Sequence, residues 1–537
     1  PNNGQNNVGV YTPNDSIINL GYGRIRIDDG KRNTGIFLNN TGGVIHSESD
    51  MLLNGGERNT AIYAYGHNNR SIAQDVTVRS IKTTTATKDN VFIYAKGGSK
   101  VKTHKDLGGL DVKSGISSNP LAYNSSNPDT TGQTTGAVYA TDSVTEVDIS
   151  RDLTNNYKNV TTGLNVDVTG AEIQKVDSTS PTGYTGTGKY TGFGLYADNS
   201  AKIIANNNKI KVENGSTAIA ADNNATVDLK GSTVHYKGTG YALYTANGGK
   251  IDMSDLGSQH STLELAGSSV GYVNDRSNPS VTLTGATIDI QDDNVIVADL
   301  RDSSAGVVTL NIDDISPTAG TGNSLMEQVL GAGVTTKSTT GATKYKYASV
   351  DGGVLNINKS LDEASTVTDS DSEEFTKRLL YQNSKINVAN TGGVKANLNS
   401  TQLSDLSLNS PIGIAISASG KSTSNNDTQI NNDGKIEANR VGTGAGAAGL
   451  YINYGKIHNQ SNGSVEVELT GGNNNAVGLF GTNGSEITND GTVKVGGKKS
   501  FGILGLAYRL DTSGNIVDPS KESFATSGTP SEFGKVT

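Results

Sequence analysis

Five aspartates are the residues of this sequence best placed for acid–base chemistry. They cluster between residues 289 and 302, as Asp289, Asp292, Asp293, Asp299 and Asp302. Glycoside hydrolysis uses two carboxylates, one as general acid and one as base or nucleophile. Because the sequence gives no sign that these side chains converge, a solvated acidic face is the favoured interpretation. A second acidic run, residues 369–374, is interpreted as a helix N-terminus, where the helix dipole favours negative charge.

Other catalytic and metal-binding patterns are missing from the sequence. It contains no Cys, and its six His are scattered without an H-E-x-x-H pair, so we expect no thiol chemistry, no metal and no cofactor. No G-x-S-x-G nucleophile turn occurs. Gly420-Lys421-Ser422-Thr423 is similar to the end of a phosphate-binding loop, but Ala415 stands where that loop needs a glycine. The sequence therefore predicts a protein that is not an enzyme.

Tyrosine is the remaining residue type with binding potential, since its ring stacks and its hydroxyl forms hydrogen bonds. One set occupies an equivalent position in repeated segments: Tyr63, Tyr94, Tyr139, Tyr196, Tyr244 and Tyr451, followed by Phe480 and Leu504. We favour a structural stack of rings for this set. The alternative is a strip that binds sugar rings, which requires exposed ring faces.

A second set of tyrosines lies in or beside segments that break the repeat. Exposed Tyr among Ser, Gly and Asn is typical of adaptable binding surfaces. The alternative is that they are ordinary loop residues. As ligand-binding residues the sequence nominates Tyr123, Tyr157, Tyr184, Tyr190, Tyr345 and Tyr347.

Short repeated units must position these residues. The segments GLYADN, AIAADN and ALYTAN begin at Gly194, Ala218 and Ala242, 24 residues apart. A second unit recurs near the C-terminus, as IHNQSNGSVEV from Ile457 and ITNDGTVKV from Ile487. Repetition along most of a chain is typical of solenoids.

Each unit is predicted to form two or three short strands that close one coil of a right-handed parallel β-helix. Apolar and polar residues alternate with period two, as in Val227-Asp228-Leu229. Gly, Asn and Asp between the strands supply positive φ angles for tight turns. Stacked coils share one narrow core, so a chain with only 33% hydrophobic residues can still fold. We predict an all-β fold, with one continuous β-helix over residues 1–537.

Four segments interrupt the period and are predicted to be insertions. They are rich in Pro, Gly, Ser and Thr, and they span residues 104–135, 148–192, 317–347 and 360–385. Two short helices are expected inside them. One covers residues 323–331, between an N-cap and a Gly stop, and the other covers 374–381, after a capping box.

Charge and hydropathy exclude two further classes of protein. The net charge is −9, and no stretch concentrates Lys and Arg, which argues against binding nucleic acid. No run of about 18 apolar residues exists, so no helix is expected to span a membrane. The chain starts at Pro1 without a signal peptide and ends within its own repeat texture, so we expect it to be part of a longer protein.

The repeated segments resemble those of a known family. The units GLYADNSAKI, AIAADNNATV and ALYTANGGKI are similar to passenger-domain repeats of type V autotransporters, and the units from Ile457 and Ile487 resemble those of the large fusobacterial autotransporter adhesins. The resemblance implies a passenger displayed at the cell surface outside the outer membrane, carried by a C-terminal β-barrel that these residues do not include. It identifies no ligand.

These observations favour a surface adhesin without catalytic activity. In this hypothesis, the β-helix is a stiff spacer, and insertions or an exposed face bind a receptor, glycan or protein, on a host cell or a partner bacterium. One alternative is a β-helix carbohydrate-active enzyme that uses the aspartate cluster. Another is self-association of neighbouring rods, which would aggregate cells. The lack of Cys suits export, because no disulfide can form while the chain crosses the periplasm unfolded.

Overall fold

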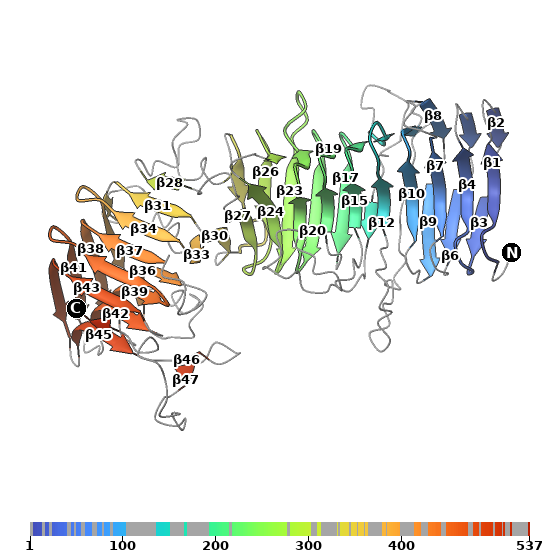
Figure 1. The fold of residues 1–537 in the computed structure, drawn as a ribbon. Coiled ribbons are helices and arrows are strands. Elements are labelled where there is room, and N and C mark those ends of the chain that lie inside the picture. Colours follow the sequence, from blue (N-terminus) through green and yellow to red (C-terminus); the bar gives the residue numbers. More distant parts are fainter. Residues whose placement is uncertain are drawn as a thin grey trace. The chain divides into compact units, whose positions relative to one another are not determined.

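A computed structural model gives the fold of the chain. The residues that it describes are 4–12, 17–20, 24–39, 44–47, 50–54, 59–66, 72–77, 80–85, 90–103, 136–150, 166–168, 193–213, 217–275, 280–301, 309–312, 330, 333–342, 345–351, 353–358, 360–362, 379–382, 384–397, 413–419, 428–441, 447–470, 476–482, 485–497, 500–506, 509–510, 516–517 and 535–536. These residues form parallel β-sheets, and the predicted all-β solenoid is confirmed (Figure 1). The right-handed sense of the coil and its continuity over 1–537 stay predictions.

The described structure divides into two compact units. The first comprises Pro1–Asn274, Asn278–Val297 and Gly331–Thr343, and the second comprises Asp275–Ser277, Ala298–Leu330 and Lys344–Thr537. The chain passes between the units more than once, and one of these divisions falls within strand β27 (Ile296–Arg301), after Val297. Each unit is described by itself below.

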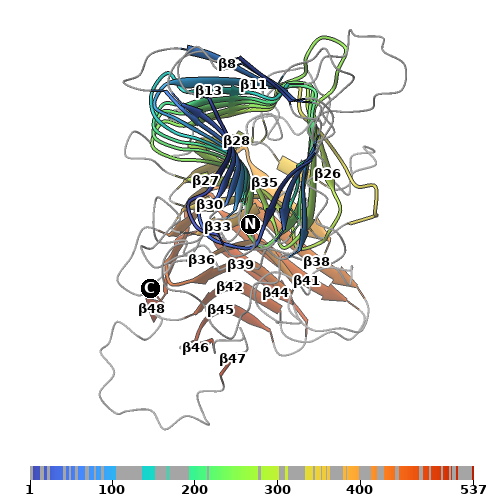
Figure 2. The same cartoon turned by 90° about the vertical axis from the view of Figure 1, so that its right-hand side faces the viewer.

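Three walls of parallel strands build the first unit, and Figure 2 shows its blue and green strands stacked behind one another. The first wall, called the tyrosine wall here, is β1 (Val8–Thr12), β4 (Thr34–Asn39), β7 (Thr60–Tyr65), β10 (Val91–Lys96), β12 (Gly136–Ala140), β15 (Phe193–Ala197), β18 (Thr217–Ala221), β21 (Tyr241–Thr245) and β24 (Val270–Asp275). The second wall is β2 (Ile17–Leu20), β5 (Val44–Ser47), β8 (Ile72–Thr77), β11 (Ser99–Thr103), β13 (Glu146–Asp148), β16 (Lys202–Ile204), β19 (Thr226–Asp228), β22 (Lys250–Asp252) and β25 (Val281–Thr282). The third wall is two sheets, β3 (Arg24–Asp28), β6 (Asp50–Asn54) and β9 (Ser80–Thr85), then β14 (Val166–Val168), β17 (Lys209–Glu213), β20 (Thr233–Gly238), β23 (Thr262–Gly267), β26 (Thr287–Ile290) and β29 (Thr335–Lys337).

The second unit also has three parallel sheets. One is β30 (Lys346–Asp351), β33 (Leu379–Gln382), β36 (Gly413–Ser419), β39 (Ala447–Asn453), β42 (Ala476–Thr482) and β45 (Phe501–Leu506). The next is β28 (Thr309–Ile312), β31 (Val354–Ile357), β34 (Lys385–Val388), β37 (Gln429–Asn432), β40 (Lys456–Asn459), β43 (Glu486–Asn489) and β48 (Lys535–Val536). The third is β32 (Ser360–Asp362), β35 (Gly393–Asn397), β38 (Lys435–Val441), β41 (Ser464–Thr470) and β44 (Thr492–Gly496). A separate antiparallel pair joins β46 (Arg509–Leu510) to β47 (Ile516–Val517).

A narrow apolar core runs through the stacked coils because equivalent residues pair in register. In the tyrosine wall, one such inward row has every side chain at most 1% exposed: Ile36, Ile62, Ile93, Val138, Leu195, Ile219 and Leu243. Each of these side chains packs against its equivalents one coil above and one coil below. Burial therefore accumulates by stacking, as expected for a solenoid.

Asparagine and aspartate shape the corners between the tyrosine wall and the second wall. Asn199, Asn223 and Asn247 have φ angles of 50°, 49° and 46°, a region that Asn tolerates better than most residues. Their side chains also link coils: Asn223 Nδ2 donates to Asp198 Oδ1 at 2.8 Å, and Asn247 Nδ2 donates to Asp222 Oδ1 at 2.9 Å. The Asn-rich composition thus serves turns and coil-to-coil hydrogen bonds.

Parts of three predicted insertions belong to regular coils. Within 148–192, strand β14 pairs with β17. Within 317–347, β29 pairs with β26, and within 360–385, β32 pairs with β35. Each of these strands has only three residues, which is too few to show a period in the sequence. The segment 104–135 lies outside the described residues.

The two predicted helices have different outcomes. For the helix at 374–381, the prediction is wrong at its end, because Leu379–Gln382 is strand β33 and pairs in parallel with β30. Hydrogen bonding to the neighbouring strand β30 outweighed the helical pattern of this segment. Of the helix at 323–331, only Leu330 lies within the described residues, where it is buried. A search of the described residues finds no helix with the length and apolarity needed to cross a membrane.

Candidate functional site

Six aromatic residues form a continuous stack along the tyrosine wall. On successive strands from β1 to β15, they are Tyr11, Phe37, Tyr63, Tyr94, Tyr139 and Tyr196, and we call them the outer tyrosine row. Between neighbours in this order, the ring centroids are 5.4, 4.8, 5.2, 5.1 and 5.2 Å apart. The spacing follows from the ~4.8 Å separation of paired strands.

Strand alternation places this row on the outside of the coil. In β10, Ile93 and Ala95 are at most 1% exposed and point into the core. Tyr94 lies between them in sequence, and it is half-buried, as are Phe37, Tyr63, Tyr139 and Tyr196. Tyr11, on the first strand, is 48% exposed. The row is therefore a surface feature of the first unit.

The ring faces in the middle of the row cover one another. The planes of Phe37 and Tyr63 are inclined by 22°, those of Tyr94 and Tyr139 by 22°, and those of Tyr139 and Tyr196 by 27°. A sugar ring stacks on an open aromatic face, and these faces have a neighbour on each side. What the row presents to solvent is a line of ring edges. The structural interpretation of the tyrosine set is thus favoured over a sugar-stacking strip.

The row ends at Ala220, which lies in register between Tyr196 and Tyr244. Tyr244 is only 3% exposed, and its ring lies 5.5 Å from that of Tyr241, centroid to centroid. Tyr244 thus has the equivalent coil position that the repeat predicts, but its ring does not stack in the outer tyrosine row. The reason is the missing ring at Ala220, because stacking passes only between adjacent coils.

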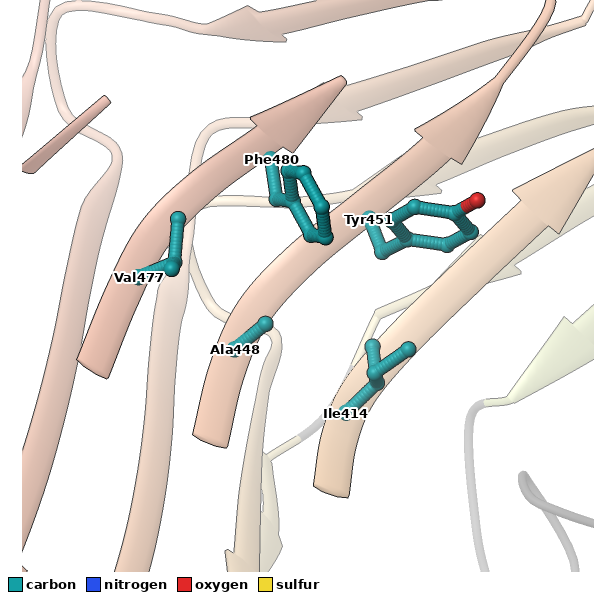
Figure 3. Close-up of a cluster of buried hydrophobic side chains, with 5 residues drawn as sticks. All are labelled: Ile414, Ala448, Tyr451, Val477 and Phe480. Atoms are coloured by element: carbon teal, nitrogen blue, oxygen red, sulfur yellow. The ribbon is translucent and has the colours of Figure 1, made fainter. Parts of the chain in front are cut away.

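A smaller aromatic cluster lies in the second unit. Tyr451 and Phe480 are in register on β39 and β42, with ring centroids 5.1 Å apart. They pack with Ile414, Ala448 and Val477, all at most 8% exposed (Figure 3), and Leu504 packs against this cluster. The Tyr451 hydroxyl is 2.9 Å from Thr482 Oγ1. This cluster is packing and offers little exposed ring surface.

A cation lies against the outer tyrosine row. Lys96 Nζ is 5.7, 5.2 and 5.8 Å from the ring centroids of Tyr63, Tyr65 and Tyr94, within the range of cation–π attraction. Burial alone lowers the pKa of Lys96, but the hydrogen bond to Tyr63 and the nearby phenols raise it above its ordinary value. Lys96 is therefore charged at neutral pH.

Burial shifts the pKa of the central phenols upward. It raises the pKa of Tyr94, and it raises the pKa of Tyr139 to about 12, with a further contribution from the Asp198 carboxylate. At neutral pH these hydroxyls keep their protons, so they can donate as well as accept hydrogen bonds. The surface thus combines apolar ring edges, neutral hydroxyls and one cation.

Of the six loop tyrosines nominated from the sequence, the structure describes the side chain of Tyr345 alone. Tyr345 is only 7% exposed, so it is not the exposed tyrosine that was expected, because it immediately precedes strand β30 and is packed there. Tyr347 lies in β30, and its side chain is outside the described residues. Also outside them are Tyr123, Tyr157, Tyr184 and Tyr190.

The aspartate cluster has structural partners. Asp289 is 4% exposed; its Oδ1 accepts the Thr339 N–H at 3.0 Å, and its Oδ2 accepts the Thr339 hydroxyl at 2.9 Å. Asp292 Oδ1 accepts the backbone N–H of Asn294 at 3.2 Å in a turn. Asp302 lies outside the described residues.

Sequence reasoning missed Glu264, which pairs with Asp289 in register one coil away. Its Oε2 lies 3.0 Å from His235 Nδ1, on the coil at its other side. The register of the third wall brings these groups together, although 29 residues separate His235 from Glu264 in sequence. Only alignment of the coils could have revealed the contact. Both carboxylates are held by protein partners, which suits a structural row.

Neither metal-binding groups nor similarity to known proteins indicates a function for this chain. Among the residues described above, no group of three or more His, Cys, Asp or Glu side chains is arranged to hold a metal ion. Comparisons with protein-family models, with curated proteins and with solved structures found no match.

Proposed function

We propose that this chain is a cell-surface adhesin, displayed outside the outer membrane as the passenger of a type V autotransporter. It binds a receptor on a host cell or a partner bacterium and catalyses no reaction. The observation that carries the proposal is the outer tyrosine row: six aromatic residues on six successive strands, half-buried or exposed on one face of a regular coil stack. The resemblance of the repeats to passenger domains supports the location.

The composition of this face favours recognition through edges and hydroxyls. Tyrosines lose little conformational entropy on binding and supply both apolar and hydrogen-bonding contact. Their stacking fixes the rings before a partner arrives, which lowers the entropic cost of association. Lys96 adds one positive charge beside Tyr63 and Tyr94. Such a face fits a protein surface or the hydroxyl-rich edge of a glycan.

Binding of the fluorescently labelled full chain to cultured epithelial cells and to whole bacteria, measured by flow cytometry, tests the proposal. A variant with Tyr63→Phe, Tyr94→Phe and Tyr139→Phe keeps the stacked rings and removes three hydroxyls. The matched control is Tyr451→Phe, which removes a hydroxyl that is buried against Thr482 in the second unit. We expect the triple variant to bind several-fold more weakly and the control to bind as the parent does.

Two results would contradict the proposal. One is the lack of saturable binding of the parent chain to any of these cells. The other is equal binding by the parent and by a chain with Tyr63→Ser, Tyr94→Ser and Lys96→Ser that is still folded by circular dichroism. Sedimentation of the parent chain at increasing concentration separates receptor binding from self-association, which would appear as dimers or larger species.

A further inference from the structure

Four tyrosines follow one another without interruption in the outer tyrosine row: Tyr63, Tyr94, Tyr139 and Tyr196. The ring centroids of neighbours are 5.2, 5.1 and 5.2 Å apart, and the ring planes are inclined by 33°, 22° and 27°. Parallel pairing in register makes the four side chains leave their strands in the same direction. Phenol rings held this closely can be joined through their ring carbons once they are oxidised.

The charges beside the row make Tyr139 easier to oxidise than Tyr63 or Tyr94. Lys96 Nζ lies 5.7 and 5.8 Å from the ring centroids of Tyr63 and Tyr94, and a nearby cation opposes the removal of an electron. Burial, and after it the Asp198 carboxylate, raises the pKa of Tyr139, so a negative group lies close to that ring. Negative charge favours the loss of an electron. We therefore expect a tyrosyl radical to settle on Tyr139.

Phe193 holds Tyr139 and Tyr196 in place from one side. Its ring contacts both of them edge-on, with centroids 6.4 and 5.8 Å away and planes inclined by 69° and 75°. Phe193 is 4% exposed, whereas Tyr139 and Tyr196 are half-buried. Their outer edges are thus open to a small oxidant, and the rings have room to tilt towards a neighbour on that side.

We propose that one-electron oxidation joins Tyr139 to Tyr94 or Tyr196 as a dityrosine cross-link between adjacent coils. Each of the two phenols gives up one electron and its hydroxyl proton, which leaves a phenoxyl radical with spin density on Cε. The two radicals form a Cε–Cε bond, and each Cε hydrogen then moves as a proton to the phenoxyl oxygen, which restores both hydroxyls. Hydrogen peroxide, used by a haem peroxidase, takes up the two electrons and two protons and becomes two water molecules. This inference is independent of the adhesin proposal.

Two other tyrosines provide matched comparisons within the chain. Tyr11 stacks on Phe37, with ring centroids 5.4 Å apart. Tyr451 lies in register between Ser417 and Phe480, and its ring centroid is 5.1 Å from that of Phe480. Phenylalanine and serine form no phenoxyl radical, so these in-register neighbours do not supply the second half of the cross-link.

Treatment of the dilute, folded full chain with hydrogen peroxide and a haem peroxidase tests this assignment. Dityrosine fluorescence gives the total yield, and a denaturing gel shows whether the cross-link lies within one chain or between chains. After trypsin digestion, Tyr94 is the sole tyrosine of peptide 89–96, whereas Tyr139 and Tyr196 lie in peptides 114–151 and 190–202. Fragmentation of the joined peptides in a mass spectrometer locates the linked tyrosines. The same treatment in urea gives the yield without stacking.

We expect the folded chain to form several-fold more dityrosine than the unfolded chain, within single chains. Tyr139→Phe keeps the stacked ring and removes both couplings, so its yield should fall several-fold. The matched controls Tyr11→Phe and Tyr451→Phe should give the parent yield. The proposal is overturned if the folded parent forms no more dityrosine than the unfolded chain, if Tyr139→Phe keeps the parent yield, or if the linked peptides do not include Tyr139. The comparison of the folded with the unfolded parent holds even if a variant does not fold.

Discussion

Tyr94 and Tyr139 lie in register on β10 and β12, with ring centroids 5.1 Å apart and ring planes inclined by 22°. They are far apart in sequence, and parallel strand pairing alone brings them together. The same pairing continues to Tyr63 on one side and Tyr196 on the other. The ring of Tyr94 therefore has an aromatic neighbour on both faces, and its stability contribution is open to measurement.

Replacing Tyr94 by Ala should destabilise the first unit. An aromatic pair contributes about 0.5–1.5 kcal/mol beyond its buried area, and Tyr94 takes part in two such pairs. We expect a loss of about 1–3 kcal/mol for Tyr94→Ala and less than about 1 kcal/mol for Tyr94→Phe, which keeps the ring. Urea unfolding checks both values. Equal losses in the two variants would show that the hydroxyl, and not the stack, is what matters.

Replacing Asn59 by Ala should remove one step of a buried asparagine ladder. Asn59 is fully buried; its Oδ1 accepts the Asn33 N–H at 2.8 Å, and its own N–H donates to Asn90 Oδ1 at 2.7 Å. The variant leaves the Asn33 N–H without an acceptor, at a cost of about 1–3 kcal/mol. Urea unfolding measures it, with the exposed Asn462→Ala as control. A change in Asn59→Ala no larger than in the control would refute the ladder's role.

Replacing Gly136 by Ala should disturb the aromatic packing beside the row. A Cβ on Gly136 would overlap the ring of Phe193, which is 4% exposed and contacts Tyr139 edge-on. We expect a loss of about 1–3 kcal/mol from this overpacking, seen as a lower urea midpoint. In the matched variant Gly502→Ala, the new Cβ has its nearest neighbour 3.9 Å away, so stability should stay constant or rise. A harmless Gly136→Ala would mean that the ring moves aside freely.

Alkaline pH should weaken the fold through its buried phenols. Burial raises the pKa of Tyr139 and of Tyr451 to about 12, from a value of 10.0 in an exposed tyrosine. Below pH 10, both folded and unfolded states keep these protons, so the contribution to stability is fully present. Between pH 10 and about 12, the unfolded state releases them first, and stability falls as pH rises.

Urea midpoints measured across this alkaline range check the expected slope. The slope should become smaller in Tyr139→Phe and in Tyr451→Phe, because each removes one shifted phenol. An unchanged slope in both buried variants would contradict the assignment.

The sequence period was sufficient to predict the coil and the central part of the row. Tyr63, Tyr94, Tyr139 and Tyr196 each follow an Ile, Val or Leu by one position, and this inward apolar residue defines the register. Phe37 follows Ile36 in the same way, but Leu38 stands next to it where the other segments have Ala, so this segment departs from the repeat pattern.

Burial could not be predicted from the sequence at single positions. Tyr345 was expected to be exposed, yet it is buried. Tyr244 is buried as well, and it packs with Ala220 and Val273 from the neighbouring coils. Asp289 is similar, since its partner Thr339 belongs to a turn 50 residues away. The contact between His235 and Glu264 likewise depends on the register of two coils. The burial and the contacts of these residues arise when coils stack, so the sequence of one strand does not predict them.

Because the register across Ala220 repeats every 24 residues, one whole coil could be removed from the chain here. Residue 196 is matched with 220, and 220 with 244, so removing residues 197–220 would join Tyr196 to Ala221, the residue already equivalent to Ala197. The shortened chain would place Tyr196 directly beside Tyr244, and β13 would pair with β19 in the register that β16 now provides. Loss of this one coil would therefore shorten the molecule while it lengthens the row of adjacent rings.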